Sequence, residues 1–188
     1  MRHYVQGNAA AFKTLMVRYD SKITGFVARR CADRHSIDDL VQEIWMRVVH
    51  RASTFREQSS FKTWLYTIAR HKCIDVSRRA VHRRAVTLDE PLRRDEEGGV
   101  TVVDQAADQG PGPDRLASDR RFLTALEQLM EELPPDQREV FDMRALQQLK
   151  FREIAEIVGV PENTIKSRMR YALQTLRGRL EKLGWSLS

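Results

Sequence analysis

The chain has 188 residues, 31% of them charged and 41% hydrophobic, with a formal net charge of +6; this composition suits a soluble helical fold and favours an anionic partner. Its two cysteines, Cys31 and Cys73, lie far apart in the sequence and indicate no disulfide framework, so we expect a reducing cytoplasm. No apolar run approaches the roughly 20 residues that cross a membrane. The first residues lack the apolar core of a signal peptide.

Apolar residues recur at helical spacing through the first 85 residues. Four helices are therefore expected, over residues 9–19, 21–31, 37–50 and 61–84. Asn8 and Ser36 each precede one of these helices and are predicted N-caps. On the last helix, Trp64 lies on the apolar arc, which favours a position in the core over one on a stacking surface. Tyr66 is expected on the opposite, exposed face.

The segment Val86–Ser118 breaks the helical pattern. It contains eight acidic and three basic residues, a charge of −5, whereas the rest of the chain carries +11. Its Gly and Pro residues are typical of a linker. The predicted organisation is a domain of residues 1–85, a flexible acidic linker of residues 86–117 and a domain of residues 118–188. Because no strand-like alternation is sustained, the predicted fold class is all-α.

The segment Phe151–Leu180 predicts a helix-turn-helix with a basic second helix. Ala155 is small where two helices cross, Gly159 allows a left-handed backbone where the first helix ends, and Ile165 points back into the pair. A helix of this kind fits the major groove of DNA. The exposed face of the second helix carries Lys166, Ser167, Arg168 and Arg170. A merely solvated basic face is the alternative interpretation.

Three segments together resemble one family. They are DDLVQEIWMRVVHRASTF at residues 38–55, SSFKTWLYTIARHKCIDVSRR at residues 59–79, and residues 133–180, which include the helix-turn-helix. In this order the chain resembles a bacterial RNA polymerase sigma factor of the extracytoplasmic-function (ECF) class. The resemblance implies two helical domains, a promoter-melting region two at residues 1–85 and a region four at residues 118–188 that binds the upstream element.

The resemblance implies two DNA surfaces. The second helix of the helix-turn-helix would enter the major groove of the minus-thirty-five element, although Arg168 is also explained by contact with a neighbouring acid or the DNA backbone. The residues expected at this element are Arg144, Thr164, Lys166, Ser167, Arg168 and Arg170. The loop 54–60 and the helix after it would hold the melted minus-ten strand. The residues expected there are Arg56, Lys62, Tyr66, Arg70, His71, Lys72, Arg78 and Arg79.

One departure from the family concerns position 71, which is commonly Asn and here is His71. His71 still has a donor and an acceptor, but its fit to a flipped base would change, so the resemblance does not give the base preference at this position. The resemblance further implies that one face of the helix 37–50 binds the clamp helices of the largest polymerase subunit. The residues expected on that face are Asp39, Gln42, Glu43 and Arg47. Acids that only complement a helix start would explain Asp39, but not Gln42 or Glu43.

The sequence carries no P-loop, dinucleotide-binding turn or nucleophile elbow. Cys31 with His35, and His71 with Cys73, do not make a zinc ligand set. We therefore expect no enzymatic activity, cofactor, metal or small-molecule substrate.

The expected partners are core RNA polymerase, promoter DNA and an anti-sigma factor that is tethered to the membrane. The acidic linker is expected to screen the basic domains of the free protein, so that neutralising Asp95, Glu96 and Glu97 raises non-specific DNA binding. A stand-alone dimeric regulator is the second hypothesis, but it leaves residues 38–79 without a purpose. An interaction protein that binds no DNA, such as a decoy for an inhibitor, is the third, and the intact basic face of residues 162–170 argues against it.

Overall fold

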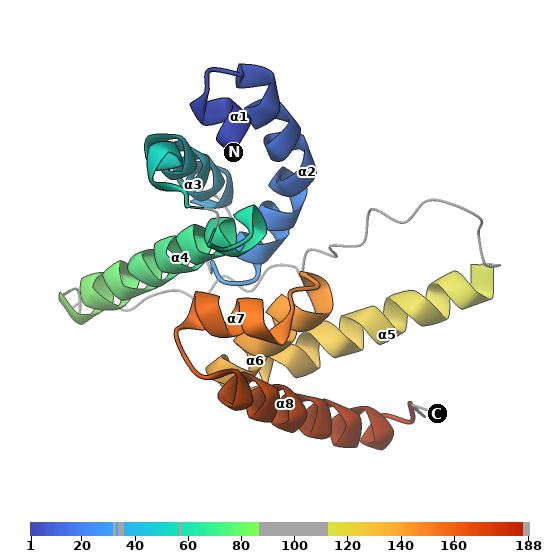
Figure 1. Ribbon diagram of the computed structural model, residues 1–188. Helices are drawn as coiled ribbons and strands as arrows, with labels where there is room; N and C mark the ends of the chain where they lie inside the picture. The colour runs from blue at the N-terminus through green and yellow to red at the C-terminus, as the bar shows by residue number, and fades with distance from the viewer. Residues whose placement is uncertain (32, 34–35, 57, 87–112, 186–188) are drawn as a thin grey trace. The chain divides into compact units, whose positions relative to one another are not determined.

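The computed structural model describes residues 1–31, 33, 36–56, 58–86 and 113–185. All regular structure in these residues is helical (Figure 1), which confirms the predicted all-α class. The chain divides into two compact units, one of Met1–Asp95 with Ala155–Gly159 and the other of Glu96–Ile154 with Val160–Ser188. Most of the predicted acidic linker lies outside the described residues, so the linker, its screening role and the domain bounds stay predictions.

The helices of the first unit are α1 (Arg2–Val5), α2 (Ala9–Ala28), α3 (Ile37–His50) and α4 (Phe61–Val86), with a short 3-10 turn at Ala52–Thr54. The Oδ1 atom of Asn8 accepts a hydrogen bond from Ala11 N at 3.2 Å and caps α2 as predicted. The expected break between two helices near Tyr19 is wrong, because α2 continues through the polar residues Asp20 and Ser21. Ser36 precedes α3, but its hydroxyl donates to Asp33 instead of capping the helix.

The core of the first unit forms where α2, α3 and α4 pack together. The largest completely buried side chains of these helices are Phe26, Tyr66, Ile23, Ile44, Leu65, Val27 and Val48. The indole Nε1 of Trp45 on α3 donates to Oδ1 of Asp20 on α2 at 2.8 Å, which satisfies the polar atom of a side chain that is only 5% exposed. The packing of these three helices gives α3 and α4 a fixed relative position.

The helices that follow in the chain are α5 (Pro113–Glu131), α6 (Pro135–Phe141), a π-helical turn (Asp142–Leu146), α7 (Phe151–Val158) and α8 (Glu162–Lys182); all belong to the second unit except the residues of α7 from Ala155 onward. The helix α5 begins at Pro113, within the segment predicted as the linker. An apolar cluster joins α8 to α5 and α6. Its buried members are Leu129, Met130, Leu133, Phe141, Ala172, Leu176 and Leu180.

The turn that leads into α8 has the predicted features of a helix-turn-helix. Gly159 has a φ of +79°, a left-handed conformation that side chains other than glycine rarely adopt. The carbonyl of Pro161 accepts hydrogen bonds from Thr164 N at 2.9 Å and from Ile165 N at 3.3 Å. Ile165 is completely buried, as the sequence predicts. The turn therefore fixes the residue at which α8 begins.

None of the helices in the described part of the chain is both long and apolar enough to cross a membrane.

Candidate nucleic-acid and polymerase interfaces

The N-terminal half of α8 presents a polar and basic exposed face. Lys166, Ser167 and Arg170 are exposed, and Thr164 is half-buried. The Nζ atom of Lys166 lies 2.7 Å from Oε1 of Glu162, one helical turn earlier. Such an exposed pair is worth little in water, so exchanging this carboxylate for a DNA phosphate or base costs little. This half of α8 fits the predicted role of a helix that reads duplex DNA.

Two other predicted contacts of the duplex, Arg168 and Arg144, are held against the protein. Arg168 Nη2 lies 2.5 Å from Oδ2 of Asp136 on α6, as expected if the arginine contacts a neighbouring acid. Arg144 Nη1 donates to the carbonyl of Leu149 at 3.0 Å, and its guanidinium lies 5.0 Å from the ring centroid of Phe151. Both arginines thus stabilise the unit that carries α8.

The start of α4 is fixed by a serine cap and an aromatic cluster. Ser60 Oγ accepts a hydrogen bond from Thr63 N at 3.1 Å, which caps the helix. The ring of Trp64 packs on Phe55 and Phe61, with centroids 5.2 and 6.0 Å apart. Trp64 is half-buried, so it lies at the edge of the core and not within it. These contacts hold the loop that contains Arg56 against α4.

The cations predicted at the minus-ten strand differ in exposure. The exposed ones are Arg56, His71, Arg78 and Arg79, and the half-buried ones are Lys62, Arg70 and Lys72. Exposed cations along one helix can follow the backbone of a single strand.

Tyr66 is the exception, because the structure contradicts its predicted place on this surface. Its side chain is completely buried, and its ring meets Phe26 of α2 edge-on at a centroid distance of 5.1 Å. The helix α4 packs against both α2 and α3, so its buried face is wider than the apolar arc in the sequence. Tyr66 therefore belongs to the core and cannot stack on a base in this conformation.

The predicted polymerase surface lies on α3. Asp39, Gln42 and Glu43 are exposed on this helix. Glu43 forms an ion pair with Lys72 of α4, and Arg47 Nη1 lies 3.9 Å from Oδ2 of Asp75, also on α4. Three of the four predicted contacts are thus exposed to a partner, and one of these three, Glu43, is also paired with α4, as is the half-buried Arg47.

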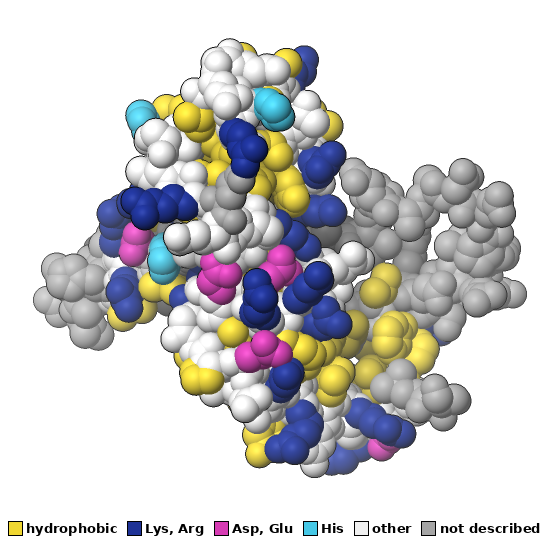
Figure 2. Space-filling view, viewed as in Figure 1, with side chains coloured by type: hydrophobic (Ala, Val, Ile, Leu, Met, Phe, Trp, Pro, Cys, Tyr) yellow, Lys and Arg dark blue, Asp and Glu magenta, His cyan; other side chains and the backbone are white. Residues whose placement is uncertain are grey.

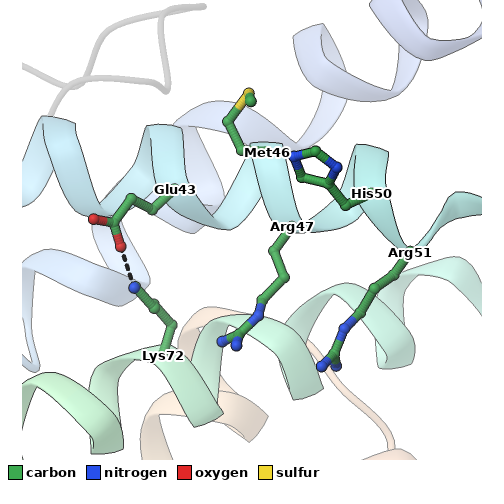
Figure 3. A pocket seen from close by; sticks show the side chains of 6 residues that line it. All are labelled: Glu43, Met46, Arg47, His50, Arg51 and Lys72. Atoms are coloured by element: carbon green, nitrogen blue, oxygen red, sulfur yellow. Dashed lines mark ion pairs between the residues drawn. The ribbon is translucent and has the colours of Figure 1, made fainter.

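A shallow groove of about 350 Å³ lies beside these pairs. Its lining residues are Glu43, Met46, Arg47, His50, Arg51 and Lys72 (Figure 3). Met46 is 56% exposed, which gives the otherwise polar α3 surface an apolar contact. A charged surface around an exposed methionine suits a protein partner.

Lys and Arg side chains occur at many points of the face in Figure 2, with acidic side chains beside several of them. The predicted DNA-binding cations Lys72, Lys166 and Arg168 each form an ion pair with an acidic side chain. Local acids thus offset part of the basic charge at the predicted DNA surfaces.

Comparison with protein families agrees with this geometry. Residues 15–83 match the family model of sigma-70 region 2, and residues 123–176 match that of sigma-70 region 4. Together the two matches cover more than half of the chain, in the order expected from the sequence. Curated relatives of similar length are ECF RNA polymerase sigma factors. The chain belongs to the ECF class of sigma factors.

Individual sigma factors resemble the chain along most of its length. It is 28% identical to the ECF sigma-E factor of Haemophilus influenzae, with 95% of this chain and 92% of that protein covered. It is also 28% identical to the ECF sigma factor SigW of Bacillus subtilis, with 95% and 93% covered. Its identity to the sigma-H factor of Pseudomonas aeruginosa is 26%, with 95% and 90% covered.

Two solved structures share the fold of this sigma factor. One is the sigma factor RpoE in complex with the anti-sigma factor NepR from Bartonella quintana, with a TM-score of 0.70, 20% identity, and 91% and 97% of the two chains covered. The other is CnrH in complex with the cytosolic domain of CnrY, with a TM-score of 0.64, 20% identity, and 94% and 92% covered.

Two residues of the sigma factor's surfaces are not predicted by its sequence. Asp75 and Asp136 pair with Arg47 and Arg168 from other helices, and no sequence spacing links partners on separate helices. Among the described residues, no three His, Cys, Asp or Glu side chains come together in a way that holds a metal ion.

Proposed function

We propose that this protein binds core RNA polymerase and directs it to a set of promoters, where it reads a duplex minus-thirty-five element and captures a melted minus-ten strand. The observation that carries the proposal is the ordered pair of family matches, region 2 at residues 15–83 and region 4 at residues 123–176. A stand-alone regulator would need only the region 4 match, which contains the helix-turn-helix. The chemistry of transcription belongs to the polymerase, and this chain adds promoter specificity.

At the upstream element, the exposed half of α8 supplies the contacts. Lys166, Ser167 and Arg170 meet base edges or nearby phosphates, with Thr164 beside them. Arg168 and Arg144 support the helix from the protein side, since both already have partners in the fold.

At the melted element, the loop before α4 and the exposed side of that helix supply cations to the strand. Arg56 lies in the loop before the helix, and the exposed side chains of His71, Arg78 and Arg79 lie along it. His71 retains a donor and an acceptor for a flipped base, in a different geometry from the asparagine common in this class.

The exposed polar face of α3 is the proposed contact with the clamp helices of the largest polymerase subunit. Acidic and amide groups at Asp39, Gln42 and Glu43 complement a basic coiled coil, which favours the association rate and the register. Control by an anti-sigma factor, tethered to the membrane while the sigma factor stays in the cytoplasm, completes the proposal. One protein of the same fold has been solved with the anti-sigma factor NepR, and another with the cytosolic domain of CnrY.

The deciding experiment is run-off transcription with purified bacterial core polymerase and a genomic DNA library. We expect transcripts that depend on this protein and share an upstream element and a minus-ten element. Lys166→Gln should weaken this selection, whereas Arg177→Gln should not. The two cations are matched, because Arg177 forms the same kind of i,i+4 pair on α8, with Glu181 at 3.0 Å. Duplex binding without any transcript would favour the stand-alone regulator.

A further inference from the structure

An ion pair between Arg168 and Asp136 ties the DNA-reading helix α8 to α6. The atoms Arg168 Nη2 and Asp136 Oδ2 lie 2.5 Å apart, and the arginine side chain is only 24% exposed. Asp136 lies in the first turn of α6, where the helix dipole favours a carboxylate. The guanidinium is therefore held by an ion pair at close range, with most of the arginine side chain shielded from solvent.

Arg168 lies at the edge of the buried stripe of α8. It follows Ile165 by three residues and precedes Ala172 by four, and both of these side chains are completely buried. Residues at this spacing share one side of a helix. Lys166 and Ser167, in contrast, are exposed. Arg168 therefore does not share the outward direction of the residues proposed to meet DNA.

We infer that Asp136 and Arg168 form a positioning pair, which fixes the rotation of α8 and thereby aims Lys166 and Ser167 at the bases. The hydrophobic attraction that holds α8 is non-directional, so the ion pair adds a directional contact that the apolar stripe lacks. A planar guanidinium held by a carboxylate restricts rotation of the helix, because its donors have a fixed geometry. The inference rests on the proposed function, since it concerns the same DNA surface.

A direct phosphate contact is the competing role for Arg168, and it has different consequences. Loss of a phosphate contact weakens binding to all sequences alike and lowers the salt slope by about one. Loss of Asp136 would then leave binding unchanged or strengthen it. Loss of a positioning pair lowers the discrimination between sequences, whichever partner is removed. Removing the second partner then adds little, because the two residues act as one unit.

The test uses the full chain bound to core polymerase and two DNA probes. One probe is a promoter fragment recovered by the run-off experiment, and the other is the same fragment with a scrambled upstream element. Asp136→Asn and Arg168→Gln should each lower the affinity ratio of the two probes by about three- to tenfold, and the double variant by no more. The charge exchange of Asp136→Arg with Arg168→Asp should recover part of the ratio.

Glu132→Gln is the matched control. Glu132 Oε2 forms an ion pair with Nη1 of Arg179 at 2.8 Å; this arginine lies farther along α8 and its side chain is 52% exposed. Its loss should leave the affinity ratio unchanged. Thermal unfolding followed by circular dichroism checks that each variant is folded. If a single variant does not fold, the charge exchange tests the inference in its place.

Four results would overturn the inference. The first is an unchanged affinity ratio in both single variants. The second is a folded charge exchange that recovers none of the ratio although the single variants lose it. The third is a uniform loss of affinity in Arg168→Gln with a salt slope lower by about one, while Asp136→Asn behaves as the wild type. The fourth is a wild-type holoenzyme that does not distinguish the probes, which refutes the proposed function and the inference with it.

Discussion

Lys72 of α4 forms an ion pair with Glu43 of α3, and this pair joins a cation predicted to hold the melted strand to a carboxylate predicted to contact polymerase. The Lys72 side chain is 16% exposed, whereas that of Glu43 is 57% exposed. The lysine is therefore part of the contact between two helices, while its partner remains open to solvent. The predicted DNA and polymerase surfaces of the first unit meet at this pair.

We expect Lys72→Gln and Glu43→Gln each to lower the free energy of unfolding by up to about 1 kcal/mol, since a partly exposed pair is screened by water. The double variant should lose less than the sum of the two, because both changes remove the same interaction. Urea unfolding of the full chain measures these values. Arg78→Gln is the control on the same helix and should change stability by less than about 0.5 kcal/mol. Full additivity would show that the two side chains do not interact in solution.

Gly159 in the turn before α8 and Gly178 within α8 should respond to substitution by alanine in opposite directions. An alanine Cβ meets no atom within 4 Å at Gly159 or at Gly178, so only the backbone decides the outcome. Gly159 has a φ of +79°, and Gly159→Ala should cost about 1–2 kcal/mol. Gly178 lies inside α8, and Gly178→Ala should stabilise by about 0.5–1 kcal/mol.

Urea unfolding followed by circular dichroism measures both changes. The two substitutions are chemically identical, so each serves as the control of the other. Equal stability of Gly159→Ala and the wild type would mean that the turn into α8 does not need a left-handed residue.

The hydrogen bond from Trp45 to Asp20 gives a third prediction. The indole lies in the core, so removing its acceptor leaves a buried donor unpaired, at a cost of about 1–2 kcal/mol. Asp20→Leu should show this loss in urea unfolding. Asp20→Asn should cost less, because the amide oxygen can still accept the bond. Equal losses in both variants would assign the effect to the aspartate charge and not to the hydrogen bond.

The bounds of a helix were predictable where it carries a single apolar stripe that packs against the core. The spacing of apolar residues gave α3 its bounds, 37–50, and placed the start of α4 at Phe61. The stripe failed for Tyr66 because α4 has two neighbouring helices, and the sequence does not say how many helices cover a face. The break expected within α2 failed because Asp20 and Ser21 are weak helix formers and not helix breakers.

The sequence predicts which residues lie on the candidate surfaces, but it does not predict the ion pairs that they form with other helices. Lys166 and Ser167 were predicted as DNA contacts because they lie on a basic helix that follows a turn with glycine. The pairing of Arg168 with Asp136, like that of Lys72 with Glu43, depends on how separate helices pack. Resemblance to a family supplies positions, and only the fold shows which cations a local acid already holds.

Because Tyr66 is buried and His71 is exposed, substitutions at these two positions of α4 should have different effects on stability and on DNA binding. Tyr66→Ala should lower the free energy of unfolding by about 3–5 kcal/mol, because a large ring leaves a cavity beside Phe26. His71→Ala should change stability by less than about 0.5 kcal/mol, since His71 is exposed. It should nevertheless weaken capture of the minus-ten strand.

Two measurements distinguish these variants: urea unfolding of the full chain, and fluorescence anisotropy of a labelled single-stranded minus-ten oligonucleotide with the holoenzyme. The His71→Ala variant should be stable and bind the strand more weakly, or with an altered base preference. The Tyr66→Ala variant should lose strand binding only to the extent that it unfolds. A stable Tyr66→Ala protein with weakened strand binding would show that Tyr66 contacts the DNA strand. It would also mean that α4 moves away from α2 when the promoter melts.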